Sequence, residues 1–331
     1  MNDLSASFAQ VTQIIENARV RAYQKVNEEL ILMYWNVGKF LFEQSANANY
    51  GDGYMESLAE WIQDRFPGIK GFNRRGLYRM KQFYELYAGN EKVSPLVTQL
   101  SWTNHLLIMS SSKSDEEREF YIRLAIRERY SKRQLERQIQ SAYYERYMLS
   151  RQKLLPESVG TPGNPFLDSY VVEFLNLPEK FHQNDFRKAL VEGMRDFILE
   201  LGKDFTFVGE EYAIQVGNED YRIDLLFFHR TLRCLVAIEL KVGKFLPEYV
   251  SKMDFYLEGL DRQVKKKEEN PSVGLILCAS RDEEVVEYAM SRTLSPMMVA
   301  EYRLQLPDKA ILRKKLQELS SLPLPEDGAD C

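Results

Sequence analysis

The sequence contains little cysteine and histidine, and this scarcity excludes several kinds of site. Its 331 residues include three cysteines and three histidines. Cys234, Cys278 and Cys331 show no C-x-x-C spacing, which argues against a zinc site or a disulfide framework. The histidines lie far apart, so none has the spacing of a metal-ligand pair. Cys234 and Cys278 fall in apolar strand patterns, where we expect buried thiols, and a reducing cytoplasm fits this expectation.

Long apolar stretches are missing as well. No run of about 18 apolar residues occurs, so no membrane span is predicted. Residues 1–5 have no basic start followed by an apolar core, so no secretory signal is predicted. No Ser-His-Asp order, nucleophile elbow or phosphate-cradling glycine loop is visible. The net charge of −5 argues mildly against a chain coated with nucleic acid, although a local basic stripe is what binds phosphates.

The N-terminal half is expected to be helical. A length of 331 residues is comfortable for two domains, and the apolar share of 44% is that of an ordinary soluble protein. Helical spacing of apolar residues predicts helices over about 8–42, 54–66 and 74–87, the last capped by Asn73. Two sequences of the capping-box type mark further helix starts, Ser114-x-x-Glu117 and Ser131-x-x-Gln134.

The pattern changes after a stretch rich in proline and glycine. The second half predicts a helix, three strands, a helix, a strand, a helix and a further strand, at about 186–201, 205–216, 220–229, 233–241, 248–267, 273–279, 282–292 and 297–304. This is the core order of the restriction-endonuclease-like fold. We therefore expect four segments: a helical N-terminal domain (1–152), a linker (153–165), a mixed sheet flanked by helices (166–320) and a disordered tail (321–331).

Three charged residues stand in predicted strands among apolar neighbours. They are Asp224, Glu239 and Lys241. An unpaired charge in such a place would cost several kcal/mol of desolvation, so a partner is expected. Two carboxylates supply hard oxygen ligands for a divalent cation, and Lys241 points to the same strand face as Glu239. The alternative is a cross-strand ion pair in a half-exposed sheet.

This arrangement resembles the PD-(D/E)xK nuclease superfamily, in which an acid on one strand precedes an acid-x-lysine on the next. Asp224 matches the first acid, and Glu239-Leu240-Lys241 match the acid-x-lysine, 239 − 224 = 15 residues later. Ile223 stands where the nominal motif has proline. A more specific resemblance is to the bacterial YhcG family of predicted nucleases. It is carried by the stretches 32–38, 202–209, 222–229, 232–241 and 270–278.

The resemblance implies a set of roles for these residues. Asp224 and Glu239 would bind Mg²⁺, or alternatively Mn²⁺, with the backbone carbonyl of Leu240 as a third ligand. Lys241 would orient or activate the attacking water and stabilise developing negative charge. Many superfamily members add an acid from the first helix, and Glu200 is the best candidate here, although a solvated glutamate is the alternative.

Further residues are candidates for DNA contact. Some related nucleases carry a glutamine and a tyrosine four residues apart on the helix after the acid-x-lysine, where this chain has Lys252 and Tyr256. Lys244 could contact phosphate as well, or be a solvated loop lysine. In the N-terminal half, Lys70 and tyrosines accompany a basic cluster on one helix of a helix-turn-helix-like unit. That cluster is Arg74, Arg75, Arg79 and Lys81. A salt-bridge-laced surface is the alternative.

The prediction is a two-domain cytoplasmic protein with a Mg²⁺-dependent deoxyribonuclease domain. The helical domain would bind DNA, a protein partner or a second copy of the chain. The resemblance implies a role in recombination, repair or defence, and the residues do not choose among these. A non-catalytic DNA- or protein-binding module on a nuclease fold is the alternative from another class, and RNA is the alternative substrate. Trp35, Trp61 and Trp102 are expected in the core.

Overall fold

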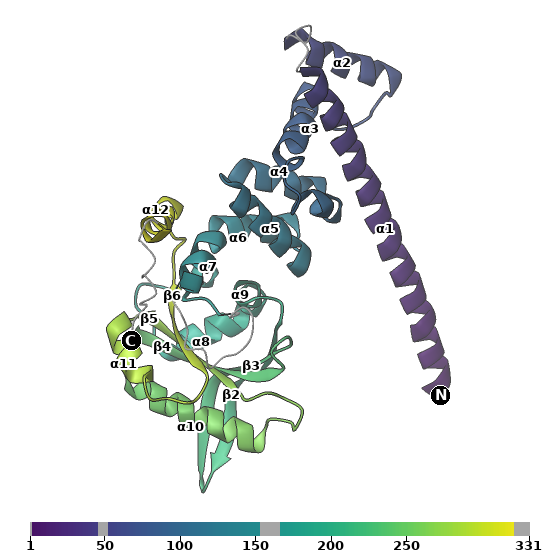
Figure 1. Ribbon diagram of the computed structural model, residues 1–331. Coiled ribbons are helices and arrows are strands. Elements are labelled where there is room, and N and C mark those ends of the chain that lie inside the picture. The colour runs from purple at the N-terminus through teal and green to yellow at the C-terminus, as the bar shows by residue number, and fades with distance from the viewer. Residues whose placement is uncertain (1, 46–51, 153–165, 321–331) are drawn as a thin grey trace, which may run out of the picture. The chain divides into compact units, whose positions relative to one another are not determined.

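The structure is a computed structural model that describes residues 2–45, 52–152 and 166–320. The contacts divide the chain into two compact units, Met1–Glu136 and Arg137–Cys331, which are described separately (Figure 1). The expected linker, 153–165, and the expected tail, 321–331, lie outside the described residues. Within those residues, no helix combines the length and apolar character needed to cross a bilayer.

The first unit is helical, as expected. Its elements are α1 (Asn2–Ser45), α2 (Asp52–Arg65), α3 (Arg74–Tyr87), the 3₁₀ turn η1 (Ser94–Gln99), α4 (Trp102–Ser111), α5 (Asp115–Glu128) and the start of α6 (Lys132–Gln140). The Asn73 side chain accepts a hydrogen bond from the Gly76 amide at 2.8 Å, and Ser114 caps α5 in the same way through the Glu117 amide. These side chains satisfy amide groups that have no partner inside their helices, which is why the helices begin there.

Aromatic side chains form the centre of this unit. Phe83 of α3 is completely buried, and its ring centroid lies 5.6 Å from that of Trp35 and 5.3 Å from that of Trp102. The expectation that Trp61 is a core residue was wrong, because its side chain is 63% exposed. The buried residues of α2 are Met55 and Ala59, one turn apart, and a residue two positions after Ala59 faces a different direction.

The second unit is a mixed sheet with helices on both faces. Its helices are α7 (Tyr143–Gln152), η2 (Glu173–Leu175), α8 (Gln183–Glu192), α9 (Met194–Leu201), α10 (Glu248–Gln263), α11 (Glu283–Met290) and α12 (Lys309–Ser320). Its strands are β1 (Ser169–Val171), β2 (Phe205–Val216), β3 (Glu219–His229), β4 (Cys234–Lys244), β5 (Val273–Ser280) and β6 (Met297–Arg303). The expected restriction-endonuclease-like order of elements is confirmed.

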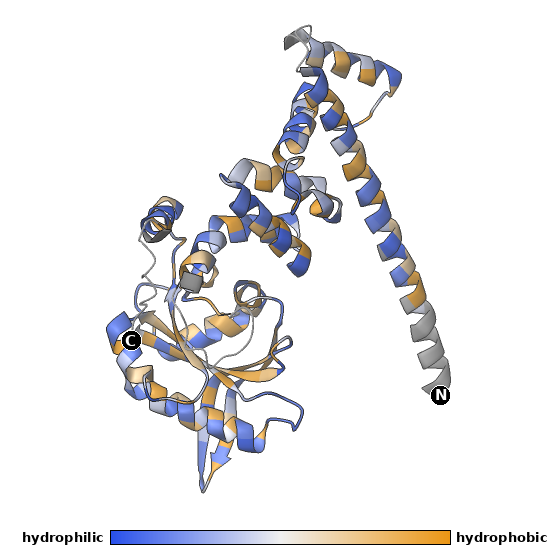
Figure 2. Ribbon diagram, viewed as in Figure 1, coloured by the Kyte–Doolittle hydropathy of each residue, from blue (hydrophilic) through white to orange (hydrophobic). Residues whose placement is uncertain are grey.

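The strand order is β1-β6-β5-β4-β3-β2. Strands β2, β3 and β4 form an antiparallel meander, whereas β5 pairs in parallel with β4 and β6, and β6 pairs in parallel with β1. Figure 1 shows α8 and α9 on one face and α10 on the other. Leu226 and Ala237 pack towards Met253 of α10, while the ring of Phe227 lies 6.1 Å from that of Phe197 of α9. The central strands are buried on both faces, and Figure 2 shows their apolar character.

One predicted helix proved to be two. The helix expected over 186–201 is interrupted at Gly193, which separates α8 from α9. A Cβ atom at this position would lie 3.1 Å from the ring of Phe174, so the close approach favours glycine. The short strand β1 and the helix α12 were not predicted, whereas the other strands of the sheet lie within a few residues of their expected bounds.

Candidate active site

The charged strand residues meet where β3 and β4 separate. The two strands pair from His229 opposite Cys234 up to Leu225 opposite Ile238. Asp224 and Glu239 are the next residues on each strand, just beyond the last pair. The amide of Leu240 donates to Asp224 Oδ2 at 2.9 Å, which ties the two strands together at this point. The sheet therefore holds two carboxylates side by side at an opening edge.

Asp224 is held mainly through one oxygen. Besides the Leu240 amide, Oδ2 accepts a hydrogen bond from Gln183 Nε2 of α8 at 2.8 Å. Arg187 Nη1 lies 3.9 Å from Oδ1 but is closer to Glu211 Oε1, at 2.8 Å. Burial raises the pKa of Asp224, and the charge of Glu239 raises it further, against the opposing hydrogen bonds from Leu240 and Gln183.

Glu239 is almost fully buried, and its two oxygens have different surroundings. Oε1 accepts from Lys241 Nζ at 2.7 Å and from Lys252 Nζ of α10 at 2.5 Å. Oε2 has no hydrogen-bond partner among the described residues. A buried carboxylate oxygen without a partner is costly, and it is the kind of hard donor that a divalent cation binds. The chemistry of Asp224 and Glu239 thus fits a divalent cation held by two carboxylates. Among the described residues, no group of three or more histidine, cysteine, aspartate or glutamate side chains is arranged to hold a metal ion.

The two lysines differ in their freedom to move. Lys241 Nζ lies 4.9 Å from the ring centroid of Tyr249, and its side chain is only 12% exposed. The Lys252 side chain is 45% exposed. Burial lowers the pKa of Lys252, but the hydrogen bond and charge of Glu239 outweigh this and raise it overall. The Lys252 ammonium group is therefore charged, and of the two lysines Lys252 is the one with access to solvent.

The other predicted contacts on this side of the sheet differ in exposure. Tyr256 is buried, its hydroxyl donates to the carbonyl of Arg222 at 2.7 Å, and its ring centroid lies 5.2 Å from Lys252 Nζ. Lys244 is exposed near the end of β4, opposite Ser280. A DNA contact by Lys244 or Lys252 stays a prediction. The ring of Tyr256 is buried, so it is not accessible to DNA in this structure.

Glu200 is engaged in a separate network. It is completely buried, and Oε1 accepts from Arg146 Nη1 at 2.6 Å and from the Val171 amide at 2.8 Å. Oε2 accepts from Arg137 Nη1 at 3.1 Å. Both oxygens thus have cationic partners in the structure, and the expected addition of Glu200 to the ligand set finds no support there.

Gln183 and Arg187 were not anticipated as part of this site. The helix was predicted to begin at residue 186, which left Gln183 outside it, and contacts between α8 and β3 are not visible in sequence spacing. Arg187 is oriented by Glu211, whose φ of 44° is unusual for a residue with a side chain. Only the three-dimensional arrangement shows that α8 reaches the Asp224 carboxylate.

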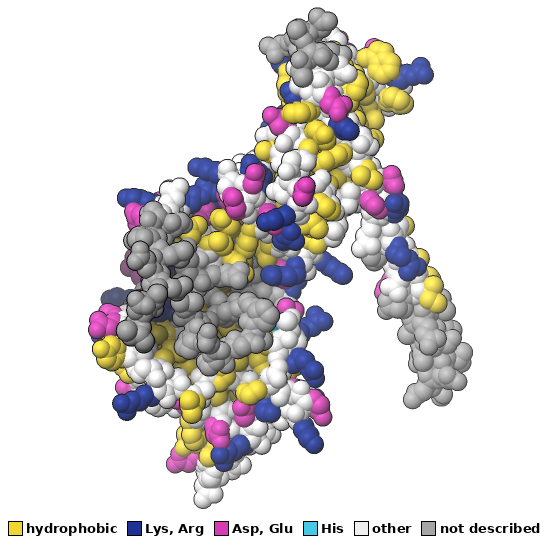
Figure 3. All heavy atoms as spheres, viewed as in Figure 1, with side chains coloured by type: hydrophobic (Ala, Val, Ile, Leu, Met, Phe, Trp, Pro, Cys, Tyr) yellow, Lys and Arg dark blue, Asp and Glu magenta, His cyan; other side chains and the backbone are white. Residues whose placement is uncertain are grey.

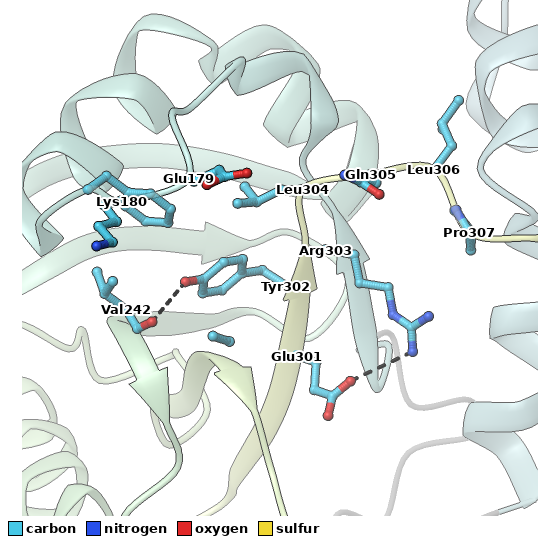
Figure 4. Close-up of a pocket in the computed structure, with 12 residues that line it drawn as sticks. Glu179, Lys180, Val242, Glu301, Tyr302, Arg303, Leu304, Gln305, Leu306 and Pro307 are labelled. Atoms are coloured by element: carbon cyan, nitrogen blue, oxygen red, sulfur yellow. Dashed lines mark hydrogen bonds and ion pairs between the residues drawn. The ribbon is translucent and has the colours of Figure 1, made fainter.

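A pocket of about 800 Å³ lies at the carboxyl ends of β4, β5 and β6 (Figure 4). Val242, which follows Lys241, lines it, and the Tyr302 hydroxyl donates to the Val242 carbonyl at 3.2 Å. Lys180 from the loop before α8 also lines the pocket, as do Glu301 and Arg303, whose charged groups lie 3.7 Å apart. Carboxyl ends of parallel strands are common ligand sites in sheets of this type.

The basic cluster of the first unit lies on α3. Arg74 and Arg75 are exposed, whereas Arg79 and Lys81 are half-buried. Arg74 Nε lies 3.6 Å from Glu56 Oε2, and its guanidinium is 5.7 Å from the centroid of the Tyr78 ring. Figure 3 shows lysine and arginine interspersed with acidic side chains on the face in view. The role of this cluster in DNA binding stays a prediction.

Comparison with known proteins shows which families the chain is similar to. Residues 164–317 match the model of the YhcG PDDEXK nuclease domain, and residues 10–146 match the DUF1016 N-terminal domain. The chain is 31% identical to "Putative nuclease YhcG" of Escherichia coli (strain K12) over 346 aligned positions, which cover 92% of each chain. The crystal structure of a repair endonuclease from Pyrococcus abyssi shares 17% identity over 40% of this chain and 50% of that one. Its TM-score of 0.26 carries no argument about function.

Proposed function

We propose, from the premise that the chain belongs to the YhcG family of PDDEXK nucleases, that it hydrolyses phosphodiester bonds of DNA with the help of a divalent metal ion. The observation that supports this best is the meeting of Asp224, Glu239 and Lys241 at one sheet edge, with Glu239 Oε2 buried and without a partner among the described residues. An unpaired buried carboxylate oxygen next to an ammonium group is expected in a site that binds a cation and a phosphate.

Asp224, Glu239 and the carbonyl of Leu240 would hold the ion, with Mg²⁺ as the expected metal and Mn²⁺ as the alternative. The bound ion would supply Lewis-acid chemistry, offsetting phosphate charge and favouring deprotonation of water. Gln183 orients Asp224 by donating a hydrogen bond to Oδ2. The other carboxylate oxygen, Oδ1, takes no part in that hydrogen bond. All the proposed ligands are oxygens, which suits a hard cation and not a soft one.

Lys241 would act on the water and the phosphate. Its ammonium group has three donors and no acceptor, so it cannot be a metal ligand. Glu239 and the Tyr249 ring hold it in one place, so it need not be ordered when the substrate arrives. A fixed positive charge in a largely buried site stabilises negative charge that develops during the reaction.

The DNA would be held by lysines and arginines on both units. In the second unit, Lys244 and Lys252 are exposed enough to reach a phosphate. In the first unit, α3 would bind DNA through Arg74, Arg75, Arg79 and Lys81. Contacts to phosphates supply affinity without sequence information, so these residues do not define a target sequence. The division into a helical binding domain over 1–152 and a nuclease domain over 166–320 forms part of this proposal.

The helical unit would also bind a protein partner or a second copy of the chain. Apolar residues on α1 follow one another at alternating steps of three and four: Tyr23, Val26, Leu30, Met33, Val37 and Phe40. Tyr23, Val26 and Phe40 are 70%, 68% and 48% exposed within the described structure. This spacing is that of a coiled-coil seam, which a second helix would cover. Size-exclusion chromatography with light scattering measures the molar mass of the protein in solution and so shows whether the chain is monomeric.

We place this activity in the cytoplasm, in recombination, repair or defence. The buried free thiols of Cys234 and Cys278 are compatible with a reducing compartment. Family membership supports a nucleic-acid substrate, and the choice among these processes follows from the substrate preferred in the assay below.

The test is incubation with supercoiled, linear and branched DNA, and with RNA of the same sequence, in Mg²⁺, in Mn²⁺ and in EDTA. Cleavage of DNA that requires a divalent cation and is lost in Asp224→Asn supports the proposal. Undiminished cleavage in EDTA would exclude a metal-dependent mechanism. Binding of DNA without cleavage under every condition would favour the non-catalytic module, and cleavage of RNA alone would change the substrate class.

A further inference from the structure

Two ammonium groups share one oxygen of Glu239, which is unusual for a site that must accept a divalent cation. Lys241 Nζ and Lys252 Nζ lie 2.7 and 2.5 Å from Oε1. The single negative charge of Glu239 is therefore already balanced. A divalent cation that binds this carboxylate meets two positive charges, and repulsion between like charges at such short range opposes its binding.

We propose that Lys252 is a resident counter-ion of Glu239, which a divalent cation displaces, and that the freed ammonium group then contacts a phosphate of the DNA. This inference rests on the proposed function and adds a step that couples metal binding to DNA binding. It assigns Lys252 a positioning role that differs from that of Lys241, although both contact the same oxygen.

The different surroundings of the two lysines identify Lys252 as the one that moves. Lys241 lies two residues from Glu239 on the same strand, with its side chain 12% exposed and its ammonium next to the Tyr249 ring. Lys252 belongs to α10, and its side chain is 45% exposed. Only Lys252 can therefore exchange Glu239 for water or phosphate without loss of packing around the carboxylate.

The position of Lys252 also suits the second half of the proposal. Its Nζ lies 5.2 Å from the ring centroid of Tyr256, one turn further along α10, and Tyr256 is fixed by its hydrogen bond to the Arg222 carbonyl. The Lys252 side chain is a flexible four-carbon stem and is half-exposed, so the ammonium group can leave Glu239 while α10 and Tyr256 stay in place. A displaced ammonium at this edge remains close to the site where a scissile phosphate would bind, and a phosphate is its natural new partner.

Calorimetric titration with Mg²⁺ tests the first half. Lys252→Gln and Lys252→Met should bind Mg²⁺ about three- to tenfold more tightly than the unaltered protein, because a competing cation has been removed from a half-exposed ion pair. Lys188→Gln, which removes an exposed lysine of α8, should leave the Mg²⁺ affinity unchanged. Unchanged or weaker Mg²⁺ binding by both Lys252 variants would overturn the inference.

DNA binding tests the second half. With Ca²⁺ as a divalent probe, Lys252→Gln should weaken the affinity for a short duplex several-fold, whereas in EDTA it should have little effect, because Lys252 is then held by Glu239. Lys188→Gln should change the affinity by the same factor in both conditions. Equal effects of Lys252→Gln with and without Ca²⁺ would overturn the coupling.

The two proposals fail in different ways. If the unaltered protein neither binds Mg²⁺ nor cleaves DNA, the proposed function fails and this inference fails with it. If the unaltered protein binds Mg²⁺ and cleaves DNA, but the Lys252 variants show the same Mg²⁺ affinity, only the inference fails. Melting curves identify any variant that has lost its fold, and the agreement of Lys252→Gln with Lys252→Met excludes an effect of side-chain shape.

Discussion

Two of the three buried glutamates described in the second unit, Glu200 and Glu239, differ in how their oxygens are paired. Each is at most 1% exposed, and each is bound by two cationic side chains. Arg146, Arg137 and the Val171 amide bind both oxygens of Glu200. At Glu239, one oxygen holds both lysines, and the other has no partner among the described residues. Both oxygens of Glu200 are therefore occupied, whereas Glu239 keeps a buried oxygen that is available to a ligand.

The cationic partners of the two glutamates differ in their freedom to move. Arg146 is 3% exposed and also donates to the carbonyls of Ser141 and Ser169, so it cannot leave Glu200 without losing several hydrogen bonds. Lys252 has a flexible stem and a half-exposed side chain, and Glu239 is its partner at this site. Arginine is suited to a permanent buried pair, and lysine is suited to a pair that must open.

Asp224→Asn should produce the largest effect, on activity and not on stability. It removes one of the two charged ligands, so the single-turnover rate of DNA cleavage should fall about a thousandfold or more. Burial and the charge of Glu239 raise the pKa of Asp224, so its ionised form is unfavourable in the fold and the neutral variant should melt at an equal or slightly higher temperature at pH 7.

The matched control for this variant is Asp220→Asn, which changes an exposed aspartate on the same strand. It should alter neither the cleavage rate nor the melting temperature. Full cleavage activity in Asp224→Asn would place the reaction elsewhere in the chain.

Glu200→Gln should have the opposite profile. Removal of one partner from a buried ion pair leaves Arg146 and Arg137 without their counter-charge, and it should lower the free energy of unfolding by about 3–5 kcal/mol. The cleavage rate per folded molecule should stay the same. Chemical denaturation followed by circular dichroism measures the first quantity, and Glu173→Gln, at the exposed side of Arg137, is the control with a small expected effect.

The same network gives a pH dependence. Burial alone would raise the pKa of Glu200, but the charges of Arg146 and Arg137 outweigh it and hold the pKa below the usual 4.5. A lowered pKa in the folded state adds stability above pH 4.5, and this stability is lost as the pH falls further. Glu200→Gln should therefore flatten the decline of stability below pH 4.5. A decline of unchanged steepness would assign it to other carboxylates.

Much of this comparison could be predicted from the sequence, and part of it could not. Asp224, Glu239 and Lys241 were identified because charges in apolar strand patterns need a partner, and the strands form as their alternation predicts. The structure agrees that the three residues meet. Their catalytic and metal-binding roles stay predictions, which the variants above test.

The role of Glu200 was not accessible in this way. Its arginine partners are 54 and 63 residues away in the sequence, and no local pattern links them. Gln183 reaches Asp224 over 41 residues for the same reason. Local periodicity and capping predict where helices and strands begin, whereas pairings between distant polar side chains depend on how the elements pack, as does the break at Gly193 against Phe174.

Lys241→Met sharpens the comparison at the site itself. The substitution keeps much of the length and apolar character of the stem but removes the charge, so the single-turnover rate should fall about a hundredfold or more. Mg²⁺ should still bind, because an ammonium group is not a metal ligand. A rate equal to that of the unaltered protein, in a variant with a normal melting curve, would make Lys241 a structural ion-pair residue like Arg146.

The arginines of α3 extend the comparison to charges on the surface of the first unit, where the smallest effect is expected. Arg75 and Arg79 have no acidic partner at ion-pair distance among the described residues, and Arg74 is 3.6 Å from an exposed Glu56. By contrast, Arg123 and Arg127 of α5 lie 2.8 and 2.7 Å from Glu119 and Glu128. An arginine that is already paired has less charge to offer a phosphate, so the two groups should differ in their contribution to DNA binding.

Replacement of Arg74, Arg75 and Arg79 by alanine should weaken DNA binding several-fold and make it less dependent on salt. Each phosphate contact that is lost lowers the slope of log K against log salt by about 0.9, so the number of contacts can be counted from the slope. The double variant of Arg123 and Arg127 should change the slope by less than one contact, because their glutamate neighbours already balance their charge. Binding to a labelled duplex is measured by fluorescence anisotropy at several salt concentrations in EDTA, so that cleavage does not interfere.

Equal slopes in the unaltered protein and the α3 variant would return these arginines to the role of solvated surface charges. DNA binding in EDTA would then depend on other exposed cations, such as Lys244 near the end of β4 in the second unit.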